Sequence, residues 1–85
     1  MAEVVVGLKV LPKNVEINLD ELEEKIKSAI NPEKIDREPI AFGLVAFHVV
    51  KFVPDSGGEL EKVEKKLREI EEVGEVEVTG ISRSL

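Results

Sequence analysis

The chain has 85 residues, of which 18 are acidic, 12 are basic and none is cysteine, and its formal net charge is −6 at pH 7. This length suits one hydrophobic core, so we predict a single domain over residues 1–85. The lack of cysteine excludes thiol chemistry, and the negative charge argues against nucleic acid or anionic lipid as a partner. Without a leader-like N-terminus or a membrane-length apolar run, we expect a cytoplasmic protein with no membrane partner.

The N-terminal third changes from the period of a strand to the period of a helix. Valine and leucine occupy alternate positions in residues 3–11, which predicts a strand with one buried face. Apolar residues then recur at helical spacing in residues 19–30, with Asn18 as the expected N-cap and Glu21 three positions further on. We expect this helix to end at Asn31, because the residue before a proline avoids the α region.

The rest of the chain predicts a hairpin, a helix and a final strand. Residues 33–53 form an extended region, with a mixed run to Pro39, a short centre at residues 41–43 and a long apolar run over residues 44–53, which indicates the hairpin. Proline, aspartate, serine and glycine in residues 54–58 should break it. A second amphipathic helix is predicted over residues 60–70, with Gly74 available as its C-cap. Strict alternation in residues 75–79 predicts a half-buried strand, followed by a short tail.

The predicted order is strand, helix, strand, strand, helix, strand. The split βαβ motif satisfies this order with right-handed crossovers, which predicts an α+β, ferredoxin-like βαββαβ sandwich: a four-stranded antiparallel sheet with two helices on one face. The first and third strands should be central, because they are the most continuously apolar segments. In the third strand we expect Val45, Phe47 and Val49 to face the helices.

The chain offers little for covalent chemistry. His48 is the only side chain that ordinarily titrates near neutral pH, and no second histidine exists to help it bind a metal. As a strand residue it should lie on the face opposite to Phe47. The numerous carboxylates alternate with lysines on the predicted helices, where solvated ion pairs are the ordinary explanation. We therefore predict no catalytic residues, no cofactor and no metal.

The centre of the predicted hairpin is unusual because it carries no charge, although turns at sheet ends normally face water. Two explanations are open: the aromatic residue folds back over the ends of the helices as part of the core, or it is an anchor offered to a pocket on a partner protein. The candidate partner-binding segment consists of Pro39, Ile40, Ala41, Phe42, Gly43 and Leu44.

Residues 40–47 match part of the third-strand signature of RNA recognition motifs. The match holds at Phe42, Gly43, Val45 and Phe47 but fails at the basic, glycine and middle aromatic positions of the signature. The chain is also acidic, whereas an RNA-binding domain should be basic. An RNA-binding domain therefore stays a minor alternative, beside a regulatory ligand-binding or oligomerising ferredoxin-like module.

A second resemblance covers essentially the whole chain. The sequence EPIAFGLVAFHV, residues 38–49, resembles the beta subunit of archaeal elongation factor one. The segments VVVGLKVLP, LDELEEKI and VEVTGISR fit the first strand, first helix and last strand of that family. The resemblance implies a guanine-nucleotide exchange factor that acts by binding elongation factor one alpha, the GTPase that carries aminoacyl-tRNA to the ribosome. It also implies a protein that is monomeric on its own.

The family resemblance further implies roles for individual residues. Phe42 would be the hairpin-tip aromatic that enters an apolar pocket on the G domain, with Ala41 and Gly43 shaping the turn. Members of the family tend to end with a basic residue that approaches the magnesium site, and the nearest candidate in this chain is Arg83. The alternative for Arg83 is a solvated residue of the C-terminal tail.

Overall fold

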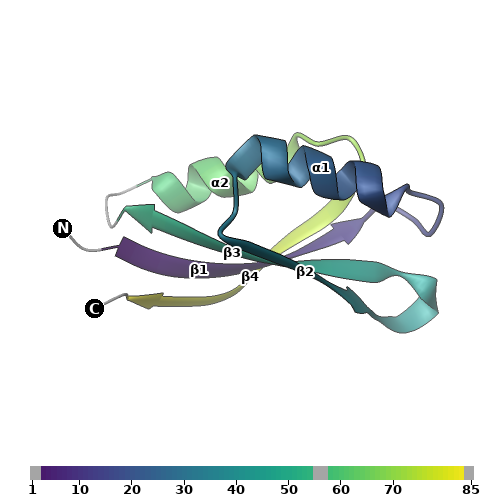
Figure 1. The fold of residues 1–85 in the computed structure, drawn as a ribbon, viewed down its shortest axis with the longest axis horizontal. Helices are drawn as coiled ribbons and strands as arrows, with labels where there is room; N and C mark the ends of the chain where they lie inside the picture. Colours follow the sequence, from purple (N-terminus) through teal and green to yellow (C-terminus); the bar gives the residue numbers. More distant parts are fainter. Residues whose placement is uncertain (1–2, 55–57, 84–85) are drawn as a thin grey trace.

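The computed structural model describes residues 3–54 and 58–83 (Figure 1). Four strands form one antiparallel sheet in the order β2-β3-β1-β4, and both helices lie on one of its faces (Figure 1). This arrangement confirms the predicted ferredoxin-like α+β sandwich. The elements are β1 Glu3–Pro12, α1 Leu19–Ile30, β2 Lys34–Pro39, the short 3-10 helix η1 Ala41–Gly43, β3 Val45–Pro54, α2 Glu59–Arg68 and β4 Val73–Arg83.

The core lies between the sheet and the helices. The central strands are β1 and β3, as their apolar sequences predicted. Of the three β3 residues expected to face the helices, Phe47 and Val49 are buried and Val45 is half-buried. Burial of this much apolar surface is the main stabilising contribution to a fold without disulfides. The largest fully buried side chains are Phe47, Leu8, Leu22, Ile26, Leu67, Val6, Val10 and Val49.

Helix α1 has the boundaries that its sequence predicts. The Asn18 side-chain oxygen accepts a hydrogen bond of 3.1 Å from the backbone N–H of Glu21, which satisfies one of the free donors of the first turn. At the other end Asn31 adopts the left-handed conformation, with φ of 46°, and its N–H donates to the carbonyl of Lys27. Both helix ends are therefore fixed by local hydrogen bonds.

The C-terminal part differs from the prediction in two ways. Helix α2 ends at Arg68, and Gly74 lies in β4 instead of capping the helix. A Cβ at Gly74 would come within 2.9 Å of the Lys13 Cα, so the close approach of two backbones is what requires glycine there. The final strand extends to Arg83, because β1 offers backbone partners as far as Val4. Of the break predicted at residues 54–58, residues 55–57 lie outside the described residues.

The second face of the sheet is left uncovered by α1 and α2 (Figure 1). It carries a mixture of charged and apolar side chains, in keeping with an antiparallel sheet that faces water on one side. Within residues 3–54 and 58–83, no helix has the length and apolar character needed to cross a bilayer.

Candidate functional site

The turn between β2 and β3 is an exposed apolar tip. The Ile40 N–H donates to the Leu44 carbonyl at 2.8 Å, which closes the turn. Inside it Phe42 has φ of 64° and Gly43 has φ of 76°, so two successive residues are left-handed. The Phe42 side chain is 94% exposed. The interpretation of Phe42 as part of the core is therefore wrong, and the residue projects into solvent.

The backbone of Phe42 is strained. A residue other than glycine in the left-handed region costs on the order of 1–3 kcal/mol, which persists only where the surrounding structure enforces it. The enforcing groups are the cross-turn hydrogen bond of Ile40 and the permissive Gly43 that follows. An exposed aromatic side chain held in a strained turn contributes nothing to the core, so it needs an explanation outside the folding of this chain.

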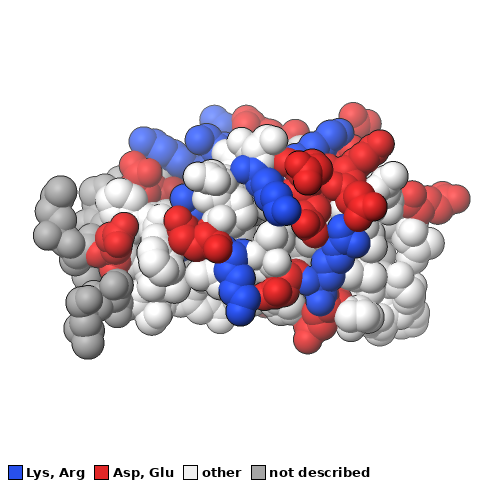
Figure 2. All heavy atoms as spheres, in the orientation of Figure 1, with Lys and Arg blue, Asp and Glu red and all other residues white. Residues whose placement is uncertain are grey.

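A second exposed apolar side chain lies beside the tip. A Cβ at Gly43 would be 3.6 Å from the Val15 Cγ1, so the loop between β1 and α1 touches the turn. Val15 is itself largely exposed. Figure 2 shows charged side chains over the helices, whereas the lower right, where Figure 1 shows the hairpin turn, is free of them. The sequence prediction missed Val15, although an apolar residue flanked by Asn14 and Glu16 in a loop was a usable signal.

Arg83 and the tip lie at opposite ends of the sheet. Arg83 pairs with Val4 at the start of β1, whereas the tip is next to the opposite end of the same strand (Figure 1). From Val45 to Val53, β3 spans about 26 Å at about 3.3 Å per residue. The backbone of Arg83 is part of β4, not of a tail. The candidate residues 39–44 come together in one turn, and Arg83 is not brought to them.

His48 lies on the uncovered face of the sheet, opposite to Phe47 as predicted. Its Nε2 is 2.6 Å from Oε1 of Glu38, and Lys9 is its neighbour on β1. The hydrogen bond with His48, followed by the charges of His48 and Lys9, lowers the pKa of Glu38. The pair joins β2 and β3 near the turn. In the part of the chain that is described, no three His, Asp or Glu side chains gather closely enough to hold a metal.

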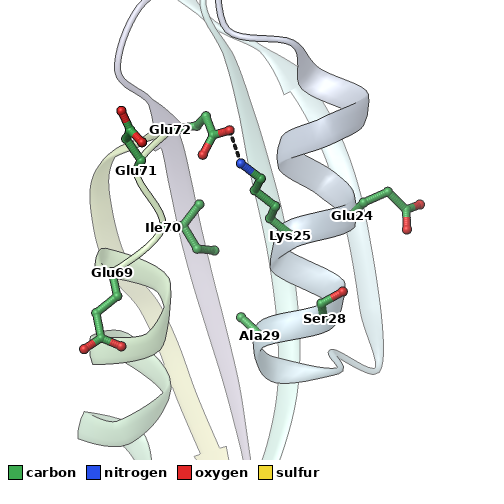
Figure 3. A pocket seen from close by; sticks show the side chains of 8 residues that line it. All are labelled: Glu24, Lys25, Ser28, Ala29, Glu69, Ile70, Glu71 and Glu72. Atoms are coloured by element: carbon green, nitrogen blue, oxygen red, sulfur yellow. Dashed lines mark hydrogen bonds and ion pairs between the residues drawn. The ribbon is translucent and has the colours of Figure 1, made fainter.

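A hollow lies between α1 and the turn after α2 (Figure 3). The Lys25 ammonium crosses it and donates to the Glu72 carboxylate, which raises the pKa of Lys25 and lowers that of Glu72. The carboxylates of Glu24, Glu69 and Glu71 point away from one another (Figure 3). These groups do not converge on a common point, so the hollow is an ion-paired junction between elements.

The fold and the tip define a small ferredoxin-like domain with an exposed aromatic hairpin. A family model described as the EF-1 guanine nucleotide exchange domain matches residues 5–83. The chain belongs to this family, and the resemblance seen in its sequence is confirmed. Family membership gives it a role in guanine nucleotide exchange during translation elongation.

Similar proteins from archaea carry the name Elongation factor 1-beta. That of Methanosphaera stadtmanae is 42% identical over 86 residues, covering 98% of this chain and 98% of the relative. That of Pyrococcus abyssi is 46% identical over 82 residues, covering 89% of each chain. That of Staphylothermus marinus is 44% identical over 89 residues, covering 98% of each. In each comparison the similarity therefore extends over most of the length of this chain and of its relative.

Proposed function

We propose that this protein promotes exchange of GDP for GTP on elongation factor 1 alpha by binding its G domain and weakening the binding of nucleotide and magnesium. The observation that carries the proposal is the exposed Phe42, held by a strained turn whose residues carry no charge. Residues 39–44 would form the partner-binding tip. The role is one of binding, without covalent chemistry, by a cytoplasmic protein that is monomeric on its own and contacts neither nucleic acid nor membrane.

Exchange by binding follows from thermodynamic linkage. If the protein binds the nucleotide-free G protein more tightly than the loaded one by some factor, it must weaken nucleotide binding by the same factor. The contacts that do this must differ between the two states of the G protein. An aromatic side chain that enters an apolar pocket only in the nucleotide-free state supplies such a contact, because its burial removes apolar surface from water.

Arg83 is proposed as a second contact, through which a cation would approach the magnesium site. Its place at the far end of the sheet means that Phe42 and Arg83 would touch separate regions of the G protein. The tip would then supply anchoring affinity, whereas the cation would oppose magnesium by like-charge repulsion. The two contributions are separable by mutation.

Two alternatives are less well supported. In an RNA recognition motif the aromatic residues of the third-strand signature stack on bases at the open sheet face, but Phe47, which matches that signature here, is fully buried beneath the helices. The same face carries Glu38 and Glu77, which oppose phosphates. A ligand-binding module would need polar groups converging in a pocket, and those around the hollow beside Lys25 diverge (Figure 3).

The test is release of a fluorescent GDP from elongation factor 1 alpha, measured at increasing concentrations of this protein. We expect the wild-type protein to accelerate release and Phe42→Ala to lose the effect. Loss of a buried aromatic anchor typically costs about 2–4 kcal/mol, which corresponds to roughly 30- to 900-fold in affinity. Phe52→Ala is the matched control, since Phe52 is 40% exposed and lies near the opposite end of β3.

Three outcomes separate the parts of this proposal. Acceleration that only Phe42→Ala loses would support both the function and the tip. Equal acceleration by Phe42→Ala and wild type would keep the function and move the contact, with Arg83→Ala as the next variant. No acceleration by a folded wild-type protein would refute the exchange function.

A further inference from the structure

The hairpin leaves the sheet at a definite row of residues. Strand β3 pairs with both neighbours as far as Phe47, which lies between Val10 on β1 and Arg37 on β2. Beyond this row, Glu38 pairs with Ala46 and Pro39 pairs with Val45, and these two rows consist of β2 and β3 alone. A two-stranded ribbon is marginally stable and twists readily. The direction in which the tip points therefore depends on what holds the ribbon at its base.

Arg37 makes three contacts at that base. Its Nη2 lies 2.7 Å from Oδ1 of Asp20, and its Nε lies 3.0 Å from Oε1 of Glu23. Its guanidinium carbon is 5.6 Å from the centroid of the buried Phe47 ring. A planar guanidinium suits this combination, because it can donate to two carboxylates in fixed directions while stacking on an aromatic face.

These contacts join the base of the ribbon to a rigid element. Asp20 and Glu23 are three residues apart in the first two turns of α1, so they lie on one face of the helix, and the cap at Asn18 fixes the start of that helix. The rest of β2 contributes little to the core, since Ile35 is its only half-buried residue and the others are exposed. Besides the apolar packing of Ile35 against the core, Arg37 supplies the hydrogen bonds and ion pairs that join this edge strand to α1.

We propose that Arg37 is a positioning residue for nucleotide exchange: by tying the base of the hairpin to α1 through Asp20 and Glu23, it sets the direction in which Phe42 is presented to the G protein. The inference rests on the proposed function. A hairpin already held in its binding direction loses less freedom when it docks, so the clamp raises affinity without touching the partner. Its effect must therefore pass through Phe42.

The first experiment is a double-mutant cycle with GDP release as the readout. We expect Arg37→Ala to reduce exchange efficiency by about 3- to 10-fold, as for the loss of a few partly exposed charge contacts. In the Phe42→Ala background, assayed at protein concentrations raised until GDP release is again measurable, the same substitution should have no further effect. Arg68→Ala is the control, because Arg68 makes a comparable pair with Glu64 on α2 at 3.1 Å. It should change exchange by less than about 2-fold.

The second experiment does not need the G protein. Amide hydrogen exchange should become faster at Ile40, whose N–H closes the turn, in Arg37→Ala but not in Arg68→Ala. The amide of Leu8 in the central strand should keep its protection in both variants. Arg37→Lys should restore the turn only in part, since lysine lacks the planar fork.

The results distinguish the inference from the proposed function. If Arg37→Ala reduces exchange by the same factor with and without Phe42, or leaves the Ile40 amide as protected as in wild type, the positioning role is overturned. If the wild-type protein does not accelerate GDP release, the exchange function fails. The hydrogen-exchange result then still decides whether Arg37 holds the tip.

Discussion

At the scale of single residues, two phenylalanines five positions apart have opposite environments. Phe47 is 0% exposed beneath the helices, whereas Phe42 is 94% exposed at the turn. The difference comes from the backbone: Phe47 alternates into the core face of β3, while Phe42 has left the strand and adopts a left-handed conformation. Composition alone would have put both in the core, because large aromatic residues are usually buried.

Two glycines of β4 give a prediction about stability. Gly74→Ala should lower the free energy of unfolding by about 1–3 kcal/mol, because its Cβ would collide with the backbone at Lys13 and Pro12. Gly80→Ala is the control, since nothing lies within 4 Å of a Cβ there, and it should change stability by less than about 0.5 kcal/mol. Urea unfolding followed by circular dichroism measures both. Equal effects would contradict the role given to the close approach at Gly74.

At the scale of elements, helix α1 supports both the core and the hairpin. Its inner face buries Leu22, Ile26 and Ile30, and its first two turns supply the carboxylates that hold Arg37. The same helix thus stabilises the sandwich and determines how the hairpin is held. A loss of order at its N-terminus should affect both.

The N-cap of α1 gives the prediction at this scale. Asn18→Ala should lower the free energy of unfolding by about 1 kcal/mol, because the N–H of Glu21 loses its acceptor. Asn18→Asp keeps a side-chain oxygen at the cap and should retain most of the stability. Chemical denaturation of the three proteins provides the comparison. A similar loss in the alanine and aspartate variants would show that the side-chain acceptor is unimportant.

At the scale of the whole molecule, the net charge is −6, and several of the charged side chains form pairs that join different elements. Three glutamates have a pKa below the ordinary value of 4.5. The main causes are hydrogen bonds from Lys27 to Glu23, from His48 to Glu38 and from Lys25 to Glu72. The folded protein therefore keeps these groups ionised at a pH at which the unfolded chain already binds protons.

The sign of the pH dependence follows from this difference. The stabilisation is present above the ordinary pKa of 4.5 and is lost as the pH falls through the lower pKa values of the folded state. The free energy of unfolding, measured with urea, should therefore be lower at about pH 3 than at about pH 6. Glu72→Gln should reduce stability at the higher pH and approach wild type at the lower. If the difference in free energy of unfolding between wild type and Glu72→Gln were the same at both pH values, the lowered pKa of Glu72 would not be its cause.

Much of this protein was determined by its sequence because the determining interactions are local. The alternation of Val4, Val6, Leu8 and Val10 defined the buried face of β1, and Asn18 and Asn31 defined the ends of α1. The order of elements then left few topologies, and the ferredoxin-like sandwich was one of them. The uncharged centre of the hairpin also marked the candidate tip without any structural information.

Only the tertiary structure decided the rest, because it depends on residues far apart in the chain. Gly74 is required by the backbone near Lys13, which no local pattern reveals. The separation of Phe42 from Arg83 is set by the pairing of β1 with β3 and β4, which puts the hairpin turn and the end of β4 at opposite ends of the sheet. The contacts of Arg37 with α1 depend on where the sheet places an edge strand beneath a helix. Residue spacing along the sequence does not predict which strand and helix residues come that close.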